Sequence, residues 1–507
     1  MSDDIQQERK KHIPEKDRNM LASAIATVLL LISLLALSVY LFGDGATAGP
    51  NQFALALCAL FAALLAQRKG YVWDEIVAAM IKGISIALPA IFILFAVGAL
   101  IGTWAMSGTI VAMIYYGLEF MNLEFFFVST CFISALISIS IGSSWTVAGT
   151  LGVGLMGIAE GVGLSSAVAA GAVISGAYFG DKASPLSDAT NLAAAVAECN
   201  VFRHIRYSLI TSLPALLIAL VGFLLIDLNQ TVEISQDRVI EIQGLLTEHF
   251  NISWLSLLPL VVVLVMVVKG LSAFLSLMTA ALVGGLLAVF MQPDVVLAFS
   301  HTENMPAPLA MLEAVWRALS NGFSIETGIE GLDNLLSRGG MASMLSTIWL
   351  ILMALAFGSV LDFSGMLRAL LQPVIDFATT TGRLFLSVVT TGFGINVLAA
   401  DQYIAIALPG RIFAKEFRKR KLAPDNLSRL IGDSSTVTSA LVPWNTCGAY
   451  MAVTLGVGTF SYLPYAFFNI ANPIISILVG AFGVKIATIA AKGNNAENVE
   501  LTLPPES

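Results

Sequence analysis

Acidic, hydroxyl and amide side chains gather in two stretches of an otherwise apolar chain, and both stretches contain a proline. The first stretch is Gly176–Ala194, with the sequence GAYFGDKASPLSDATNLAA, and its charged residues are Asp181, Lys182 and Asp188. Proline lacks a backbone donor and disfavours helix at the residue before it, so we expect a helix break around Pro185. The break would leave carbonyl oxygens beside carboxylates and hydroxyls, an all-oxygen environment that small hard cations such as Na+ prefer.

The second concentration is divided between Asn396–Gln402 (NVLAADQ) and Gly432–Tyr450 (GDSSTVTSALVPWNTCGAY). Asp401 follows an apolar run, and Pro443 occupies the same kind of position as the proline of the first stretch. A further segment, Gly142–Thr150 (GSSWTVAGT), supplies more hydroxyl groups. We predict that the supporting polar residues are Ser143, Ser144, Thr146, Ser187, Thr190 and Asp433, and that Pro185 and Pro443 break the helices.

Each acidic residue also has a purely structural interpretation. A charge inside a bilayer costs about 3 kcal/mol on insertion scales, so such charges mark functional sites by default. Asp188 and Asp401 have no adjacent cation, which favours a functional role for both. Asp181 and Lys182 could instead form a loop pair at the cytoplasmic edge, and Asp433 could cap the helix that follows it.

Composition indicates the environment of these residues. Of the 507 residues, 57% are hydrophobic and only 12% are charged, whereas a soluble domain carries about 25% charged residues. The mean hydropathy is +0.84. Because a large soluble protein needs a polar surface that this composition cannot supply, we predict an integral membrane protein.

The same composition argues against several other classes. Four scattered cysteines and four histidines indicate no disulfide framework, zinc site or metalloenzyme. A net charge of −8 without a basic aromatic patch disfavours nucleic-acid binding. The sequence shows no recognisable set of nucleophile, base and orienting group, so it does not indicate an enzyme. We also expect no resident cofactor.

Apolar runs of membrane-spanning length recur along the chain. A bilayer core requires about 20 helical residues, and the interrupted Gly- and Ser-rich stretches are tolerated only inside protein or beside a watery cavity. We predict about 10–13 transmembrane helices in an all-α polytopic fold. The runs are Leu21–Phe42, Phe53–Ala66, Ile84–Ile101, Phe125–Ile141, Ile205–Ile226, Leu255–Val268, Leu271–Met291, Met341–Leu361, Leu384–Ala399 and Leu463–Phe482.

Lys and Arg residues predict the orientation, because cytoplasmic loops are enriched in them. They are dense in the N-terminal tail and in Arg411–Lys421, whereas Gly43–Asn51 has none. We therefore expect both termini in the cytoplasm. The predicted divisions are a cytoplasmic tail (1–20), a first transmembrane repeat (21–228), an extracytoplasmic linker (229–251), a second repeat (252–484) with an outer loop (292–340), and a second cytoplasmic tail (485–507).

The chain also resembles itself at an offset of 257 residues. Ile91–Gly108 (IFILFAVGALIGTWAMSG) overlays Ile348–Gly365 (IWLILMALAFGSVLDFSG) without a gap. When the offset increases by one residue, Pro185 aligns with Pro443. The first run of one half starts on the predicted inner side, whereas Leu255–Val268 starts on the outer side. We therefore predict two inverted-topology repeats with broken or re-entrant helices, an architecture that recurs in transporters. A helical bundle with coincidental similarity is the alternative.

Three segments resemble the NhaC family of sodium/proton antiporters, and the similarity extends from the first apolar run to about Val484. The segments are GDKASPLSDATNLAAAVA (Gly180–Ala197), DQYIAIALPGR (Asp401–Arg411) and TVTSALVPWNTCGAY (Thr436–Tyr450). The family is similar to the wider ion-transporter superfamily and includes a malate/lactate antiporter. Ala183 and Ala189 depart from the pattern of many relatives, which have a bulkier residue and a hydroxyl there.

The resemblance implies an ion site and a setting in the cell. The residues implied to bind the ion are Asp181, Asp188, Asn191, Asp401, Thr438, Asn445 and Thr446. It implies a multi-pass protein of the inner (plasma) membrane that serves pH and sodium homeostasis, with Na+, H+ and Li+ as small-ion partners, the lipid bilayer as its surroundings, and a homodimer as its assembly.

Two functions follow as hypotheses. In the first, the chain extrudes Na+ in exchange for H+ at the membrane midplane, because desolvation favours a protonated carboxylate and a bound cation favours the charged form. With Asp188 and Asp401 both titrating, the exchange would be electrogenic. In the second, the chain exchanges a small carboxylate such as malate or lactate, coupled to Na+ and H+, with Lys182 and Arg411 as the obvious cationic groups. A passive channel would need a continuous polar stripe, which the sequence lacks.

Overall fold

A computed structural model describes residues 20–230, 236–300, 305–325, 333, 336–337 and 339–489. Within these ranges the chain is helical, and its only β contact is a bridge between Leu422 and Thr488. In the described ranges, eight helices are long and apolar enough to cross a membrane, or ten if each of two bent helix pairs counts as one span. The all-α fold is therefore confirmed, and the upper count equals the lower end of the predicted range.

Two helices of the second half repeat two helices of the first half, displaced by 257 residues at both ends. Helix α5 (Leu88–Met106) corresponds to α19 (Leu345–Phe363), and α6 (Thr109–Phe120) corresponds to α20 (Met366–Phe377). A left-handed glycine, Gly108 or Gly365, joins the two helices of each pair, because a glycine tolerates the positive φ of this turn. The internal repeat is thus visible in the element bounds.

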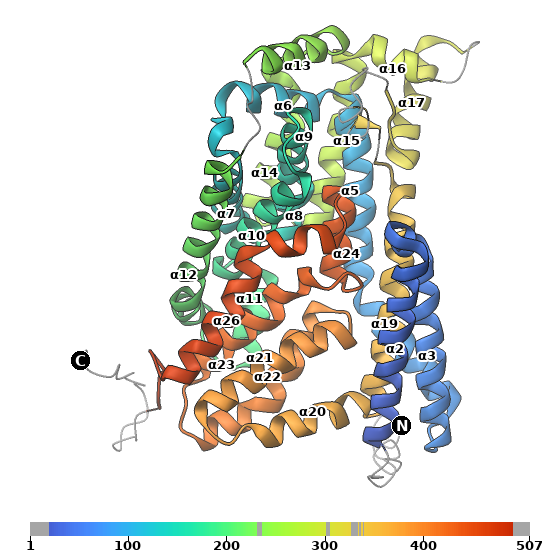
Figure 1. Cartoon of the computed structure of the whole chain (residues 1–507). Coiled ribbons are helices and arrows are strands. Elements are labelled where there is room, and N and C mark those ends of the chain that lie inside the picture. The colour runs from blue at the N-terminus through green and yellow to red at the C-terminus, as the bar shows by residue number, and fades with distance from the viewer. Residues whose placement is uncertain are drawn as a thin grey trace.

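The two copies run in opposite directions. Figure 1 shows α6 and α9 (Val153–Gly161) at one end of the molecule, and α20 and α22 (Gln402–Lys419) at the other end. The predicted inversion of the repeats is therefore present. The limits of the predicted divisions, and the side of the membrane on which each loop lies, stay predictions.

Broken helices occur twice in each half. Helix α7 (Phe126–Ile141) stops at Gly142, and the chain restarts as α8 (Ser144–Val147) and the π-helical η3 (Ala148–Gly152) before α9. Helix α10 (Ser166–Ala183) is separated from α11 (Asp188–Val196) by the turn at Pro185. In the second half the corresponding elements are α21 (Thr381–Leu398) and α22, then α23 (Pro424–Ile431), the π-helical η6 (Gly432–Thr436), η7 (Ser439–Leu441) and α24 (Thr446–Leu455).

Most of the remaining helices pack against the broken ones or against α5 and α19. Helix α13, within the predicted linker, lies at the same end as α6 in Figure 1. The predicted tail residues 1–19 and 490–507 lie outside the described part of the chain. The remaining bounds are α2 (Met20–Phe42), η1 (Gly43–Ala48), α3 (Pro50–Arg68), α4 (Trp73–Ile86), η2 (Leu123–Phe125), α12 (Val201–Leu228), α13 (Gln236–His249), η4 (Trp254–Leu257), α14 (Leu258–Val268), α15 (Ala273–Met291), α16 (Pro293–Phe299), α17 (Ala307–Asn321), η5 (Met341–Met344), α25 (Thr459–Tyr462), η8 (Leu463–Tyr465) and α26 (Phe467–Phe482).

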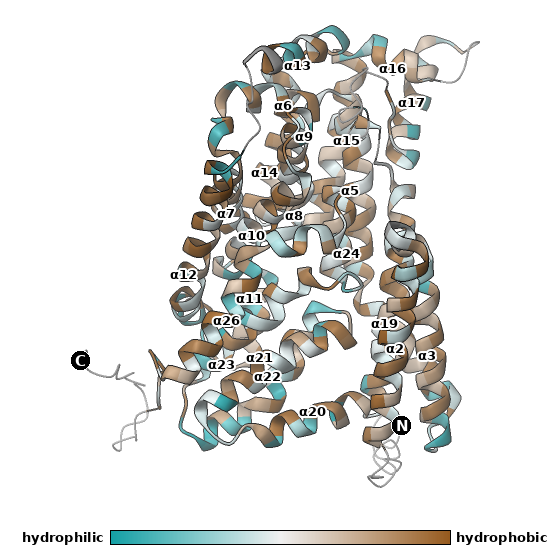
Figure 2. Ribbon diagram, viewed as in Figure 1, coloured by the Kyte–Doolittle hydropathy of each residue, from teal (hydrophilic) through white to brown (hydrophobic). Residues whose placement is uncertain are grey.

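Hydropathy and packing distinguish the outside of the bundle from its centre. Apolar residues cover the middle of α2, α7 and α12, and polar residues are more frequent toward the two ends of the molecule (Figure 2). Helix α10 is buried and packs along α7. A Cβ at Gly176 would lie 2.2 Å from the carbonyl oxygen of Cys131, and one at Gly180 would lie 2.3 Å from Cβ of Ser138. Glycines therefore allow α7 and α10 to approach closely, as small residues do in membrane bundles.

Candidate functional site

The carboxylate of Asp181 lies at the point where α10 ends and α8 begins. Ser144 donates a hydrogen bond to its Oδ2 at 2.7 Å, and Ser187 donates one to its Oδ1 at 2.6 Å. Thr190 donates to the Asp181 carbonyl oxygen at 2.9 Å. The residue is only 7% exposed, and it has no ion-pair partner in the described chain. Asp181 is therefore a buried carboxylate held by hydroxyl donors.

Lys182 belongs to a separate buried network. Its Nζ forms an ion pair with Asp433 and donates to Ser212 at 2.7 Å and to Asn472 at 3.0 Å. Thr211 also donates to the Asp433 carboxylate, at 2.9 Å. Lys182 is 1% exposed and Asp433 is fully buried, so Asp181 and Lys182 are not the exposed loop pair that the sequence left open.

Asp433 also differs from the helix-capping alternative. It lies within the π-helical turn η6, where it accepts hydrogen bonds from several side chains, among them Ser476 at 2.7 Å. The opposite charge of Lys182 and these donors satisfy the carboxylate, as a buried charge requires. The network thus neutralises the lysine beside Asp181 and leaves that aspartate without a cation.

Asp401 is another buried carboxylate of the second half; it is 3% exposed and caps α22 by accepting from the backbone N–H of Ile404 at 2.9 Å. The preceding Ala400 has a positive φ of 56°, which is unusual for a residue with a side chain. Its carbonyl oxygen accepts from the backbone N–H of Thr446 at 3.0 Å. The break between α21 and α22 therefore contacts the break before α24.

Two of the predicted second-half ligands, Thr438 and Asn445, contact the side chain of Asn396, an amide that the prediction did not include as a ligand. Asn396 donates to Thr438 Oγ1 at 3.0 Å and accepts from Asn445 Nδ2 at 3.1 Å. Asn445 also caps α24, because its Oδ1 accepts from the backbone N–H of Cys447 at 3.0 Å. Thr446 Oγ1 lies 3.4 Å from the same Oδ1. Asn396 is fully buried within the stretch NVLAADQ, and a buried amide needing several partners is the signal that could have identified it.

Side chains between the two halves connect the two clusters. Tyr178, one turn before Asp181 on α10, places its hydroxyl 3.4 Å from Ser439 Oγ. Ser439 donates to Gln402 Oε1 at 3.1 Å, and the Cys447 thiol donates to the same oxygen at 2.7 Å. Gln402 directly follows the capping aspartate of α22. The sequence had included none of these four residues among the candidate ligands.

An aromatic pair also joins the halves. Trp145 and Tyr450 stack with ring centroids 4.0 Å apart, and the Tyr450 hydroxyl donates to the Trp145 carbonyl oxygen at 2.7 Å. Trp145 follows Ser144, the donor to Asp181. Helix α8 of the first half is thus attached directly to α24 of the second half.

The other predicted ligands occupy less enclosed positions. Asp188 is exposed at the first residue of α11, and Asn191 is exposed as well. The Asn191 amide donates to the carbonyl oxygens of Pro185 and Ser187, at 2.8 Å each. The structure therefore does not bring the Asp188 and Asn191 side chains into the hydrogen bonds that hold Asp181. Of the supporting residues, Ser143 caps α8 by accepting from the Thr146 backbone N–H at 3.2 Å.

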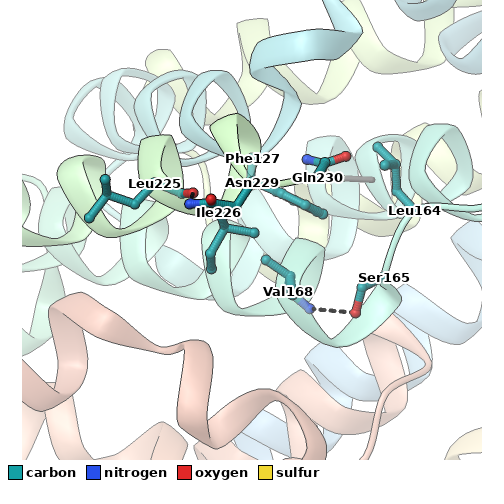
Figure 3. Close-up of a pocket in the computed structure, with 8 residues that line it drawn as sticks. All are labelled: Phe127, Leu164, Ser165, Val168, Leu225, Ile226, Asn229 and Gln230. Atoms are coloured by element: carbon teal, nitrogen blue, oxygen red, sulfur yellow. Dashed lines mark hydrogen bonds between the residues drawn. The ribbon is translucent and has the colours of Figure 1, made fainter. Parts of the chain in front are cut away.

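Two cavities lie apart from these buried carboxylates. A mainly apolar pocket of about 470 Å³ between α7, α10 and α12 is shown in Figure 3, where Ser165 caps the first turn of α10. Asp181 lies at the opposite end of α10, sixteen residues or about 24 Å along the helix axis. A second cavity of about 1100 Å³ lies between α4, α19, α20 and α22. Its charged lining includes Lys82, Asp362, Arg368, Arg411 and Lys415.

Comparisons with known proteins identify the family. Residues 176–484, which contain both broken segments with prolines, match the model of the Na+/H+ antiporter family. The chain is 38% identical over 435 residues to the Na+/H+ antiporter NhaC of Alkalihalophilus pseudofirmus, covering 85% of this chain and 90% of that protein. It is 36% identical to the malate-2H+/Na+-lactate antiporter of Bacillus subtilis (86% and 90% covered) and 33% identical to the arginine/ornithine antiporter ArcD of Halobacterium salinarum (93% and 94% covered). The chain therefore belongs to the Na+/H+ antiporter family.

Proposed function

We propose that this protein exchanges Na+ for H+ by letting the two ions compete for buried carboxylates at the helix breaks. The observation that supports this most strongly is the environment of Asp181, which is buried among hydroxyl donors while the neighbouring Lys182 is neutralised by Asp433. A carboxylate in such an environment can hold either a proton or part of a cation's oxygen shell. The names of the NhaC relatives support the same pair of ions.

The ligand shell that we propose draws on both halves. Asp181, Ser144 and Ser187 would supply oxygens from the first half, and Asp401 would supply the second carboxylate. Asp188, Asn191, Thr438, Asn445 and Thr446 remain proposed ligands for the stages of transport in which the site opens. If each loaded state reorients across the membrane and the empty charged state does not, the two ions are exchanged.

Two titrating carboxylates would give two protons per sodium ion, and the cycle would then move net charge. Measuring the exchange current of reconstituted protein at several membrane potentials tests this part of the proposal. A current that reverses with the combined ion gradients is expected, and voltage-independent exchange would contradict the unequal stoichiometry.

The exchange itself is tested in everted membrane vesicles that carry a respiration-driven pH gradient. We expect NaCl to dissipate the gradient, LiCl to do so as a second small cation, and KCl to serve as the ionic control. Vesicles that contain Asp181→Asn protein at equal abundance should not respond to NaCl. A response that requires an added organic acid would contradict simple cation exchange.

Exchange of a small carboxylate is the second candidate function, and one observation favours it. In the described chain, Lys82, Arg368, Arg411 and Lys415 line the 1100 Å³ cavity without an ion pair within 4 Å. Unpaired cations in a cavity attract carboxylates, and one relative is named as a malate/lactate antiporter. Adding malate and lactate to the vesicle assay distinguishes the two functions. In either case we propose a plasma-membrane protein with cytoplasmic termini that acts as a homodimer.

A further inference from the structure

Among the residues that the structure describes, buried polar atoms without a hydrogen-bond partner gather along the seam between α12 and α23. Eight such atoms belong to five residues, which we call the polar seam: Arg203, His204 and Ser208 on α12, and Asp425 and Arg429 on α23. Both ring nitrogens of His204 lack a partner within the described part of the chain, as do all three guanidinium nitrogens of Arg429. His204 and Arg429 are each fully buried, and burying a polar or charged group without partners costs several kcal/mol.

The polar seam begins at the surface. The guanidinium of Arg203 pairs with Asp425 at 2.6 Å, and the Arg203 side chain is 40% exposed whereas Asp425 is fully buried. One oxygen of Asp425 has no partner in the described chain. This end of the seam lies on the face of the membrane that the Lys and Arg distribution predicts to be cytoplasmic.

The polar seam ends at the Lys182–Asp433 pair. His204, Ser208 and Thr211 follow one another at helical spacing on one face of α12, and Thr211 donates to Asp433. A Cβ at Gly432 would lie 3.2 Å from Cε of Lys182 and 3.5 Å from Cε1 of His204. Gly432 has ordinary helical dihedral angles (φ −61°, ψ −40°), so its backbone does not require a glycine. A side chain at this position would instead crowd Lys182 and contact His204.

The chemistry of the unpartnered atoms indicates which occupant they fit. Arg429 offers only donors, and its Cζ lies 5.8 Å from the centroid of the Phe385 ring. Asp425 Oδ1 offers only an acceptor, His204 offers one of each when neutral, and Ser208 offers both. A small anion would satisfy the arginine and leave the acceptors empty. Water can satisfy donors and acceptors together, and a buried water needs two to four such partners.

We propose that a column of bound water fills the polar seam and connects solvent at Arg203 with the Lys182–Asp433 pair, next to Asp181. The column would be a solvent path into the core that is separate from the cation ligands. The charged and titratable groups that face it are Arg203, His204, Tyr207, Asp425 and Arg429 along its length, and Lys182 and Asp433 at its inner end. Its hydration does not depend on the proposed exchange, whereas its role as a route for protons rests on the proposed function.

Radiolytic footprinting of the purified full chain tests the hydration. X-rays split bound water into hydroxyl radicals, which oxidise the side chains beside it. We expect His204 to be oxidised several-fold faster than Tyr462, which is fully buried and donates to the Ala440 carbonyl oxygen at 2.6 Å. Tyrosine is intrinsically reactive toward radicals, so this control is strict. Oxidation of His204 no faster than that of Tyr462 would overturn the proposal.

Filling the seam tests its role in exchange. Ser208→Leu should lower His204 oxidation to the level of Tyr462 and lower the rate of Na+-dependent proton movement by about tenfold. Ser33→Leu, the same replacement at an exposed position of α2, should change neither. If Ser208→Leu fails to fold, Ser208→Val takes its place. If a seam variant loses His204 oxidation yet exchanges ions at the wild-type rate, the polar seam is not a route for protons. If the wild-type protein itself shows no Na+-dependent proton movement, the proposed function is refuted instead.

Discussion

The two halves of the molecule repeat one backbone arrangement and place charge on it differently. With a shift of 258 residues, Ser144 corresponds to Gln402 and Asp181 corresponds to Ser439. Both pairs are hydrogen-bonded, at 2.7 Å in the first half and 3.1 Å in the second. The serine is the donor in each pair. It belongs to the first element of the pair, α8, in the first half, and to the second element, η7, in the second half.

The positions of two buried carboxylates, Asp181 and Asp401, differ between the halves in the same way. In the first half the carboxylate is Asp181 on α10, and the N-cap of α8 is Ser143. In the second half the corresponding cap is Asp401, and the broken helix has Ser439 instead. The symmetric backbone thus provides two equivalent breaks, and the buried carboxylate at the break, Asp181 in one half and Asp401 in the other, belongs to a different element in each half. A single site formed by both halves fits this arrangement better than two equivalent sites.

The strongest effect on the exchange rate should distinguish Asp181 from Ser439, the two residues that correspond to each other. Asp181→Asn keeps the size of the side chain and removes the charge that the proposed site needs, so exchange should fall at least about a hundredfold, or about 2.7 kcal/mol. Ser439→Ala removes one hydrogen bond to Gln402 and should reduce exchange far less. Initial rates of Na+-dependent proton movement in proteoliposomes measure both. Equal losses in the two variants would show that the halves contribute equally.

The ion pair of Lys182 and Asp433 joins the two halves and should affect stability strongly, because both of its charges are buried. Lys182→Met leaves Asp433 charged and buried, so we expect a loss of about 3–5 kcal/mol. Replacing both residues, as Lys182→Met with Asp433→Leu, should recover part of that loss because no buried charge remains. Unfolding midpoints in detergent provide the measurement. A double variant less stable than either single variant would contradict an assignment of the pair to charge compensation.

The two positive-φ positions at the breaks, Gly142 and Ala400, should differ in how much a substitution changes stability. Gly142 has φ 76°, and a Cβ there would lie 2.7 Å from the backbone carbon of Leu186. Gly142→Ala should therefore destabilise the protein by about 2 kcal/mol or more. Ala400→Gly relieves a strained φ and should change stability by less than about 1 kcal/mol. Unfolding midpoints in detergent measure both variants. An unchanged midpoint for Gly142→Ala would disprove the close contact between the two breaks of the first half.

The smallest effects concern the caps of the two short helices that follow the proline turns. Ser187→Ala and Asn445→Ala each remove an N-cap, which costs about 1 kcal/mol. Ser187 also donates to Asp181 at 2.6 Å, so only its replacement should disturb that carboxylate directly and raise the apparent KM for Na+ several-fold. Sodium titrations of exchange at constant pH compare the variants. A larger KM change for Asn445→Ala would indicate that the second half dominates cation binding.

The sequence predicted the architecture well because its signals are local or periodic. Apolar runs indicate spans, Pro185 and Pro443 indicate breaks, and the offset between α5 and α19 appears in the residues themselves. The site was harder to predict, because its contacts join elements that are distant in the chain. Nothing near Lys182 in sequence indicates that Asp433, 251 positions away, neutralises it. Asp188 and Asp181 look alike in sequence, and only the packing of α8 against α10 distinguishes the buried one.

The most direct test of competition between the two ions is proton release on sodium binding. Purified protein in weakly buffered detergent, with a pH-sensitive dye, receives NaCl or, as the ionic control, KCl. The account predicts that NaCl releases protons from the wild-type protein, that release shrinks as the pH rises above the range in which the carboxylates are protonated, and that Asp181→Asn abolishes or strongly reduces it. Sodium binding that is measurable by calorimetry yet releases no proton at any pH would contradict the account.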